Sequence, residues 1–329
     1  MIKSYINKKF WKDKNVLITG GTGFLGGWIV KTLLDLKCNV FVIQRSNRIE
    51  SQFHIQKFFN ATKVIKGTIE DKTLIDDLFD KYKFDAVFHT AANADVNNAL
   101  SNPIDNFKSS IDSTIFILEN IRTKQPNCTA VISSSDKAYG PQKTPFKETQ
   151  SLRPHHPYEV AKASQDLIAQ SYGKVFNIPV AVTRCGNYFG GWDFNWTRII
   201  PGTIESILKG KPIILRSDGK FTRDFLYIED AVEVQLLLAQ ELSNNELIRG
   251  EPFNFSLEND LEIIELVSLI KKLMASSIKV KTDANTRAEI KIMQVSSKKS
   301  KKILNWKPIF DLNNSLLKTI NWYSTYIEK

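Results

Sequence analysis

Two groups of polar residues in the middle of the chain have the types and spacing needed for acid–base chemistry. Tyr158 and Lys162 stand four positions apart in the stretch PYEVAK, so a helix would place both on one face. An ammonium group beside a phenol stabilises the phenolate, which allows tyrosine to act as a base near neutral pH. Ser135 ends the stretch TAVISSS and could bind the hydroxyl from which Tyr158 takes a proton. An acid and an amine, Asp136 and Lys137, follow this serine directly and need a separate explanation.

A glycine-rich turn near the start of the chain predicts a dinucleotide site. The stretch VLITGGTGFLGGWIV places glycines directly after an apolar run and at the start of a helix-length segment. Gly21, Gly23 and Gly26 have the spacing GxGxxG, and Gly20, Gly23 and Gly26 have the spacing GxxGxxG. In either register, a turn without side chains lets the backbone approach a pyrophosphate, which the amides and dipole of the helix N-terminus stabilise.

The residues after the second apolar run bear on which dinucleotide binds. A carboxylate about 20 residues after the glycine turn would hold the ribose 2′-hydroxyl of NAD. The sequence there is VIQRSNR, with Gln44, Arg45 and Arg48 and no acid. Because arginine can bind a 2′-phosphate, the local sequence favours NADP over NAD. The alternative is that Arg45 only stacks on the adenine.

The pattern of apolar residues predicts an α/β fold with a doubly wound parallel sheet. Runs rich in β-branched residues predict strands at 16–19, 39–43, 62–66, 85–90, 129–134 and 179–184. Helix-length segments lie between them at 24–37, 72–82, 103–122 and 157–176. This alternation implies a sheet covered by helices on both faces, with ligands at its carboxyl edge.

Two domains are predicted, because the regular alternation of strand and helix segments ends near residue 185. Residues 1–184 form the dinucleotide-binding domain, and residues 185–329 form a smaller mixed α/β lobe that closes over the sheet edge and binds substrate. The boundary need not be clean, since a strand from the second half could return to the first sheet.

The composition is that of a globular protein and predicts a cytoplasmic location without a membrane partner. The 329 residues are 42% hydrophobic and 24% charged, with no run that reaches the roughly 18 apolar residues of a membrane span. The start of the chain lacks the apolar core of a signal peptide. The cysteines, Cys38, Cys128 and Cys185, stand far apart, which suits a reducing compartment and argues against a zinc site, so no metal is predicted.

The net charge of +10 permits binding to nucleic acid but does not require it. Lysines are spread along the chain, and the dense run at 298–302 is typical of a solvated helix face. A general positive field also favours a small anionic substrate, so no nucleic-acid partner is predicted.

Motifs spread nearly from end to end match those of one enzyme family. They are GGTGFLG, VFHTAA, SSSDKAYG, PYEVAK, RCGNYFGG, RDFLYIEDAV and LNWKPIFDLNNSLLKTINWY. With them the chain resembles extended short-chain dehydrogenases/reductases that act on nucleotide sugars, which implies a Rossmann-type sheet and NAD or NADP. FWKDKNVLITGGTGFLGGW, SDKAY and GNYFGGWDFNWTRIIP are most similar to CDP-glucose 4,6-dehydratases. Those enzymes typically use NAD, in conflict with the prediction from Arg45.

The resemblance also implies a role for Asp136 and Lys137. Dehydratases of the family carry an acid followed by Glu or Lys after the catalytic serine or threonine, whereas epimerases carry small or neutral residues. By this resemblance Tyr158 removes the C4 hydroxyl proton of the sugar while hydride passes to the cofactor, and Lys137 takes the C5 proton. Asp136 protonates the departing C6 hydroxyl, and hydride returns to C6 to give a 4-keto-6-deoxy sugar. The alternative is that Asp136 and Lys137 form a surface ion pair.

The remaining site residues are also predicted by resemblance. Those expected to bind the nucleotide-diphosphate sugar are Asn187, Arg198 and Arg223, with Arg223 on the diphosphate. Those expected to bind the cofactor are Gly20, Gly23, Phe24, Leu25, Gly26, Arg45, Ile69, Ala91, Tyr158 and Lys162. The chain departs from the family at Thr68, where an acid is usual, and at Ser110, where asparagine is usual.

The sequence therefore predicts a nucleotide-sugar 4,6-dehydratase that forms a homodimer. Relatives pair the segments 103–122 and 157–176 in a four-helix interface, whose apolar residues here would be Ile111, Ile115, Leu118, Leu167 and Ile168. A second hypothesis is a nucleotide-sugar 4-epimerase or reductase of the same family. A third is a non-catalytic dinucleotide sensor or a basic nucleic-acid-binding protein, although neither needs the set Ser135, Tyr158 and Lys162.

Overall fold

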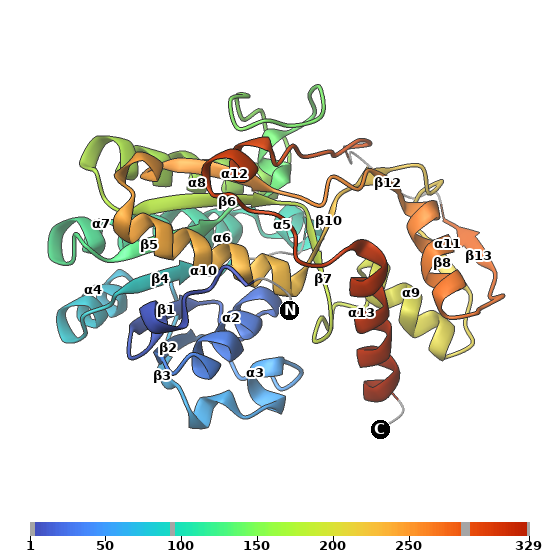
Figure 1. Ribbon diagram of the computed structural model, residues 1–329, viewed down its shortest axis with the longest axis horizontal. Coiled ribbons are helices and arrows are strands. Elements are labelled where there is room, and N and C mark those ends of the chain that lie inside the picture. Colours follow the sequence, from blue (N-terminus) through green and yellow to red (C-terminus); the bar gives the residue numbers. More distant parts are fainter. Residues whose placement is uncertain (1–3, 93–95, 284–289, 328–329) are drawn as a thin grey trace.

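The structure, a computed structural model, describes residues 4–92, 96–283 and 290–327 and is built around a seven-stranded sheet (Figure 1). Its strands are β1 (Asn15–Thr19), β2 (Asn39–Gln44), β3 (Lys63–Lys66), β4 (Ala86–His89), β5 (Thr129–Ser133), β6 (Val180–Cys185) and β11 (Glu251–Phe255). They are all parallel and lie in the order β11-β6-β5-β4-β1-β2-β3. The order reverses between β1 and β4, where sheets of this kind bind ligands at the carboxyl ends of the strands. The predicted α/β class and parallel sheet are confirmed.

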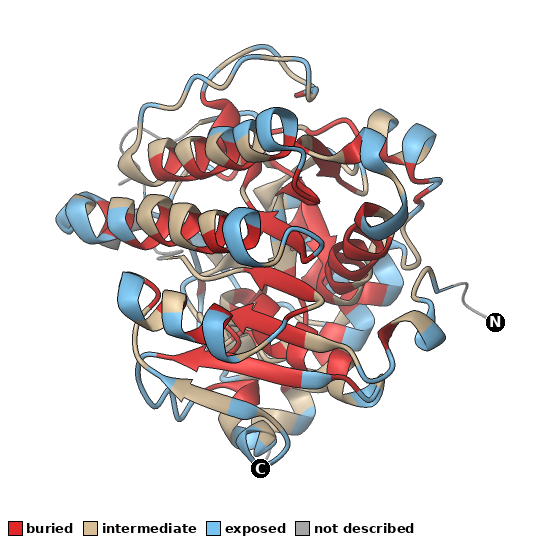
Figure 2. Ribbon diagram, turned by 90° about the vertical axis from the view of Figure 1, so that its left-hand side faces the viewer, coloured by how far each residue is buried: buried red, intermediate tan, exposed pale blue. Residues whose placement is uncertain are grey.

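Helices cover both faces of this sheet, as a doubly wound fold requires (Figure 2). On one face α2 (Phe24–Asp35) and α10 (Ile228–Asn244) share a hydrophobic core with the sheet. On the other face the sheet shares a second core with α4 (Lys72–Lys81), α7 (Ser113–Lys124) and α8 (Pro157–Phe176). Successive side chains of a strand point to opposite faces, so Val16 and Ile18 belong to the first core and Leu17 to the second.

The helix predicted at 103–122 is present but irregular. α6 (Pro103–Phe107) leads through a π-helical turn (Lys108–Asp112) into α7. A wider turn re-aims the side chains that follow it, and such turns are frequent at functional sites. Ser113, the residue after this turn, places its hydroxyl 3.1 Å from the ring of the buried His89.

The chain after β6 supplies one strand of the main sheet and a smaller mixed α/β lobe. β11 pairs with β6, and α10 covers the sheet beside it. The lobe contains α9 (Ile199–Leu208), β8 (Ile213–Leu215), α11 (Ile263–Leu273) and β13 (Val280–Thr282), with β8 and β13 paired in parallel. α13 (Leu312–Ile327) packs against α9 (Figure 1).

Short elements connect these parts. The strand pairs are β7 (Asn187–Phe189) with β10 (Phe225–Tyr227), and β9 (Thr222–Arg223) with β12 (Leu261–Glu262). The short helices are α1 (Lys8–Trp11), α3 (Gln52–Ile55), α5 (Val96–Ser101) and α12 (Lys298–Ile303).

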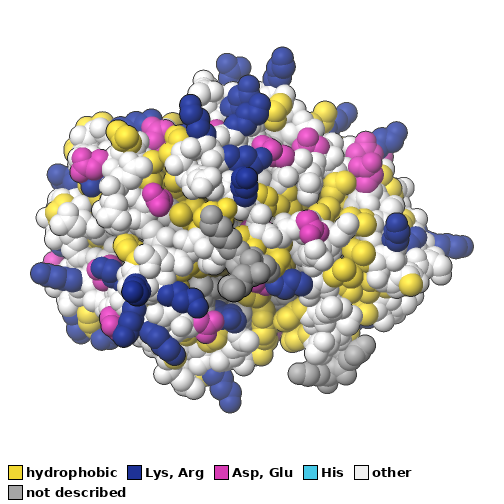
Figure 3. All heavy atoms as spheres, viewed as in Figure 1, with side chains coloured by type: hydrophobic (Ala, Val, Ile, Leu, Met, Phe, Trp, Pro, Cys, Tyr) yellow, Lys and Arg dark blue, Asp and Glu magenta, His cyan; other side chains and the backbone are white. Residues whose placement is uncertain are grey.

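Within the described ranges, no helix combines the length and apolar character that crossing a bilayer requires. Lys and Arg side chains occupy several separate parts of the face shown in Figure 3, with Asp and Glu between them.

Candidate active site

A cavity of about 2020 Å³ lies between the carboxyl edge of the main sheet and the smaller lobe. Binding pockets for one small molecule are roughly 300–1000 Å³, so this cavity has room for a dinucleotide and a sugar nucleotide together. All residues that the sequence suggested for chemistry or binding line it: Gly20, Gly23, Phe24, Leu25, Gly26, Arg45, Ile69, Ala91, Ser135, Asp136, Lys137, Tyr158, Lys162, Asn187, Arg198 and Arg223. The fold thus brings segments from both halves of the chain to one place.

The glycine turn exposes the start of α2 to the cavity. Gly20 has a φ of 74°, and a side chain there would meet the backbone nitrogen of Ala91 at 2.8 Å. A Cβ on Gly26 would overlap the carbonyl oxygen of Gly20. Gly23 caps α2 without a side-chain hydrogen bond, so the first amides of the helix can bind an anion. These features fit the pyrophosphate of a dinucleotide.

The ends of β2 and β3 carry positive charge. Arg45 and Arg48 are exposed and line the cavity, together with the acid Glu50. Gln44, at the place where NAD-binding folds often have an acid, is buried, and its side-chain oxygen accepts a hydrogen bond from Lys66 Nζ at 2.6 Å. The cavity wall here therefore presents Arg45 and Arg48 together with two acids, Glu50 and Glu70.

The first turn of α8 is held by its own residues, which determines where Tyr158 stands. Pro157 is the first helical residue, a position that suits its missing amide hydrogen. The ring of His156 accepts a hydrogen bond from the Tyr158 amide at 3.1 Å, and Glu159 accepts one from the His156 amide at 3.2 Å. This reciprocal cap begins the helix one residue before Tyr158.

Tyr158 and Lys162 lie one helical turn apart on the cavity side of α8. Lys162 Nζ donates to the Ser133 carbonyl oxygen at 2.6 Å and to Gln165 Oε1 at 3.0 Å. Burial lowers the pKa of Lys162 to about 8. Burial raises the pKa of Tyr158, and a hydrogen bond with the Ser135 side chain opposes this rise. With the Lys162 amine one helical turn away and the Ser135 hydroxyl bonded to its phenol, Tyr158 can remove a proton from a substrate hydroxyl.

Ser135, Asp136 and Lys137 stand directly after β5, where the chain forms the one-turn 3-10 helix η3 (Asp136–Tyr139). The Ser135 hydroxyl donates to Asp136 Oδ1 at 3.0 Å and accepts from the Lys137 amide at 3.2 Å. Asp136 is 4% exposed, and its Oδ2 has no hydrogen-bond partner among the described residues. Burial raises the pKa of Asp136 to about 6, against the opposing charge of Lys137. Asp136 is therefore no member of a surface ion pair, and it can supply a proton near neutral pH.

The three residues suggested for the sugar nucleotide come from beyond β6. Arg223, on β9, is 5% exposed and donates to two backbone carbonyl groups at 2.9 and 3.2 Å. Arg198 directly precedes α9 and forms an ion pair with Asp193 at 3.0 Å. Asn187, on β7, is exposed to the cavity. A guanidinium group presents five N–H donors in a planar fork, which suits diphosphate oxygens.

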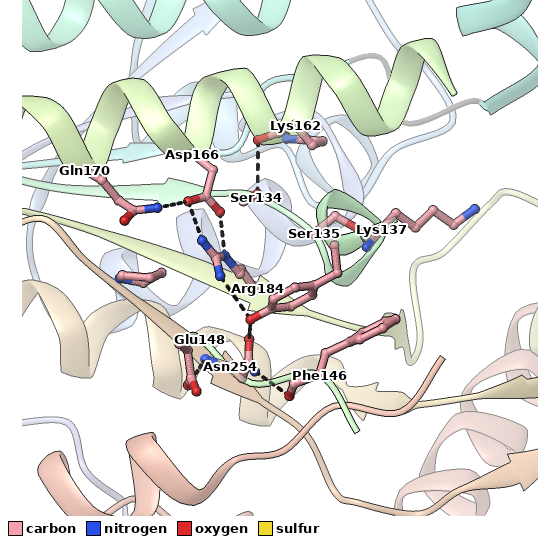
Figure 4. Close-up of polar contacts among 12 residues, drawn as sticks. Ser134, Ser135, Lys137, Phe146, Glu148, Lys162, Asp166, Gln170, Arg184 and Asn254 are labelled. Carbon is pink, nitrogen blue, oxygen red and sulfur yellow. Dashed lines mark hydrogen bonds and ion pairs between the residues drawn. The ribbon is translucent and has the colours of Figure 1, made fainter. Parts of the chain in front are cut away.

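The sequence analysis missed a buried ion pair behind the catalytic helix. Arg184, on β6, is 2% exposed and donates to both carboxylate oxygens of Asp166 at 2.7 and 2.8 Å. Asp166 follows Lys162 by one turn of α8. Arg184 also donates to the hydroxyl of Tyr139 at 3.0 Å, at the end of η3 (Figure 4). An arginine at the end of the apolar run PVAVTR was the available signal, because a charge in a buried strand needs a partner.

The fold and the site together define the class as a dinucleotide-dependent enzyme of the extended short-chain dehydrogenase/reductase type. More narrowly, the chain belongs to the GDP-mannose 4,6 dehydratase family, whose model matches residues 17–319. It is 26% identical to a dTDP-glucose 4,6-dehydratase of Salmonella typhimurium, over 94% of this chain and 92% of the relative. The predicted resemblance to nucleotide-sugar 4,6-dehydratases is thereby confirmed at the level of the family.

Solved structures agree with this membership. The dTDP-glucose 4,6-dehydratase of Bacillus anthracis in complex with NAD is 25% identical, with a TM-score of 0.83, covering 96% of this chain and 98% of that one. The UDP-glucose 4-epimerase of Thermotoga maritima with UDP-glucose is 23% identical, with a TM-score of 0.86, covering 95% of this chain and 99% of that one. The fold is thus shared by dehydratases and epimerases, and the residues of the site must distinguish the two activities.

Proposed function

We propose that the protein converts a nucleotide-diphosphate hexose into its 4-keto-6-deoxy derivative, as a 4,6-dehydratase. The observation that carries this proposal is a buried carboxyl oxygen of Asp136, next to Lys137 and to the hydroxyl of Ser135, that none of the described residues bonds. We call Asp136 and Lys137 the elimination pair, and Tyr158 and Lys162 the oxidation pair. A 4-epimerase moves a hydride at one carbon and has no use for a second acid–base pair, whereas loss of water across C5 and C6 requires one.

The two pairs act in sequence. The glycine turn would hold a dinucleotide, which would supply the hydride acceptor for C4 and the hydride donor for C6. Tyr158 takes the C4 hydroxyl proton, while Ser135 binds the same hydroxyl and the charge of Lys162 favours the phenolate. The C4 ketone makes the C5 proton acidic, and Lys137 removes it as an uncharged amine, so the elimination pair reacts with its proton on Asp136 and not on Lys137. Asp136 protonates the C6 hydroxyl, which leaves as water with formation of a C5–C6 double bond. Hydride addition at C6 and proton return to C5 complete the reaction.

For the nucleotide we propose cytidine diphosphate. Ile214, in β8, and Arg216, directly after that strand, are both exposed, and both line the cavity. Ile214 is 55% exposed, which leaves an apolar surface for a planar base beside a guanidinium group that can only donate hydrogen bonds. Cytosine presents two adjacent acceptors, O2 and N3, whereas N3 of thymine or uracil carries a hydrogen. Guanine also offers adjacent acceptors, so a GDP-hexose is the main competitor.

A panel of CDP-, GDP-, dTDP- and UDP-hexoses tests the reaction and the base together. We expect a 4-keto-6-deoxy product, detected by its absorbance in alkali, and the highest kcat/KM with the CDP-hexose. Arg216→Met should lower kcat/KM for the preferred substrate about 10–100-fold, because a bidentate base contact is worth about 1–3 kcal/mol. Lys211→Met, at an exposed position outside the cavity, is the matched control. A preference for dTDP- or UDP-hexose would refute the assignment of the base.

For the cofactor we propose NADP, with Arg45 on the 2′-phosphate. A charge-assisted pair of this kind contributes about 1.5–3 kcal/mol, so Arg45→Ala should weaken NADP binding about 10–100-fold and NAD binding little. Mass spectrometry of ligand released from the purified protein and titrations of both dinucleotides are the measurements. Arg153→Ala, an exposed arginine away from the cavity, should change neither affinity. Recovery of NAD alone, with unchanged affinity in Arg45→Ala, would contradict the proposal.

We further propose a homodimer through α6, α7 and α8. Leu118, one of the residues suggested for the interface, is instead fully buried in the core against the sheet. The apolar surface is carried by Ile104 at 66% and Leu167 at 55% exposure, on the neighbouring helices α6 and α8. Leu167→Glu should convert a dimer into a monomer in light scattering at micromolar concentration. Leu247→Glu, at a position that is 90% exposed on another surface, is the control, and a monomeric wild type would contradict the proposal.

The raised pKa of Asp136 predicts a pH profile. Because Asp136 must carry its proton to protonate the leaving hydroxyl, its titration should contribute a limb near pH 6 to kcat/KM for dehydration, in the direction of loss as the pH rises. Lys162, whose pKa is about 8, should cause a separate fall in kcat/KM as the pH rises through about 8, because it then loses the charge that favours the Tyr158 phenolate. In Asp136→Asn the lower limb should disappear along with most of the activity. If the limb near pH 6 persisted in the residual activity of Asp136→Asn, a group other than Asp136 would be responsible for it.

A further inference from the structure

A chain of buried hydrogen bonds joins α8 to η3 and β11 (Figure 4). Its members are Asp166, Arg184, Tyr139 and Asn254, each 2% exposed or less. Arg184 holds Asp166 with two hydrogen bonds of 2.7 and 2.8 Å, and its third donor reaches the Tyr139 hydroxyl at 3.0 Å. That hydroxyl in turn donates to Asn254 Oδ1 at 2.8 Å. Tyr139 is therefore bonded on both sides through one oxygen atom.

The far end of this chain is anchored as well. The side-chain amide of Asn254 donates to the carbonyl oxygens of Phe146 at 3.1 Å and Ser296 at 3.3 Å. The ring of Phe146 stacks on that of Tyr139, with centroids 4.8 Å apart. Two strands, a helix and two loops thus meet around the last residue of η3.

The catalytic end of η3 is held mainly by bonds within the turn and its cap, among them the hydrogen bond from the Lys137 amide to the Ser135 hydroxyl at 3.2 Å. Among the described backbone hydrogen bonds of the turn, the Ala138 amide donates to the Ser135 carbonyl oxygen and the Gly140 amide to the Lys137 carbonyl oxygen, each at 3.1 Å. Within the part of the chain that the structure describes, Asp136 Oδ2 has no hydrogen-bond partner, and Lys137 extends away from the buried chain (Figure 4). A single 3-10 turn has poor hydrogen-bond geometry and is not rigid by itself. The position of the elimination pair in the cavity therefore depends in part on how the other end of the turn is held.

Stability alone does not explain a buried polar chain at this place. The desolvation cost of a buried ion pair is often as large as its attraction, and apolar side chains of similar volume are often equally stabilising. The hydrogen bonds of the Tyr139 hydroxyl replace bonds to water in the unfolded chain, so their net contribution to stability is modest. Such a chain does favour one arrangement, because any shift of its members leaves a buried donor or acceptor unpaired.

We propose that Tyr139 is a positioning residue for water elimination. By bonding both Arg184 and Asn254, it holds η3 at the distance from α8 that lets the elimination pair reach C5 and C6 while the oxidation pair reaches C4. The inference rests on the proposed function, and it assigns Tyr139 to the second chemical step and not to the first.

The variant Tyr139→Phe tests this assignment, because it keeps the stacked ring and removes only the hydroxyl. In a single turnover, the absorbance of the reduced nicotinamide reports C4 oxidation, and the 6-deoxy product reports elimination. We expect elimination to slow by about 10–100-fold and oxidation to change by less than about twofold, since small misplacements of a catalytic group have effects of this size. Both steps are measured in the same molecules, so an unfolded fraction lowers them equally and leaves their ratio unchanged.

Two further variants distinguish positioning from a general structural role. Tyr227→Phe removes another buried phenol hydroxyl, one that donates to Glu229 at 2.9 Å, and should leave the ratio of the two rates unchanged. In the Lys137→Ala background, Tyr139→Phe should lower elimination by a smaller factor than it does alone, because one of the two groups that it positions is gone.

The outcomes separate the inference from the function on which it rests. The positioning role is overturned if Tyr139→Phe leaves the ratio of the elimination rate to the oxidation rate unchanged. It is also overturned if the losses of elimination caused by Tyr139→Phe and Lys137→Ala are fully additive. Absence of a 6-deoxy product from wild-type protein with every sugar nucleotide overturns the proposed function instead.

Discussion

Lys137→Ala is expected to slow water elimination by about 10²–10⁴-fold, the usual effect of removing a positioned acid or base, while sparing the first oxidation. The amine lines the cavity next to Asp136 but takes no part in the hydrogen bonds of Tyr158 or Lys162 that the structure describes. With the correct sugar nucleotide, the variant should reduce its cofactor and stop there. Stopped-flow absorbance of the reduced nicotinamide and chromatography of the sugar measure the two steps.

Solvent isotope labelling gives an independent measurement of the same step. In D₂O the wild-type product should carry deuterium at C5, because Lys137 removes that proton and solvent replaces it. Lys147→Ala, an exposed lysine in the loop after η3, is the matched control and should behave as wild type. If Lys137→Ala forms product at the wild-type rate, or if C5 remains protiated, the dehydratase assignment fails and a 4-epimerase or reductase takes its place.

Tyr158→Phe is expected to impair oxidation and elimination together, again by about 10²–10⁴-fold. Hydride cannot leave C4 unless the hydroxyl proton is removed, and the C5 proton becomes acidic only after the C4 ketone has formed. The variant should therefore show neither reduced cofactor nor 6-deoxy product, in contrast to Lys137→Ala.

The same helix offers a control for this variant. Tyr172, also on α8, donates to Glu119 at 3.1 Å outside the cavity, and Tyr172→Phe should keep both activities. Rapid cofactor reduction in Tyr158→Phe would mean that another group deprotonates the C4 hydroxyl, and the assignment of the base would then be wrong.

Local patterns predicted much of the fold. The six strands of the first half were found because a parallel sheet covered on both faces consists of short, continuous apolar runs. The helix at 157–176 has the predicted bounds, since Pro157 and the cap by His156 and Glu159 are local features. The helix at 103–122 was predicted without its π-helical turn, because one additional residue in a turn leaves no mark on the spacing of apolar residues.

Several site properties were equally visible in the sequence. The glycine spacing predicted a turn whose backbone tolerates no Cβ at Gly20 or Gly26, since that requirement belongs to a few neighbouring residues. The four-residue spacing of Tyr158 and Lys162 determined that both lie on one face of α8. By itself, then, the sequence determined the elements, the position of the glycine turn and the residues that we propose as the reactive groups.

Only the tertiary structure decided the environment of those groups. Asp136 is an acid with a raised pKa because the assembled cavity wall buries it, and burial is a property of the whole core. Tyr139 and Asn254 are 115 positions apart, and their hydrogen bond exists because β11 returns to the sheet beside β6. Contacts between distant segments have no local sequence pattern. The placement of the elimination pair is therefore set by the packing of the chain, although its chemistry can be read from neighbouring residues.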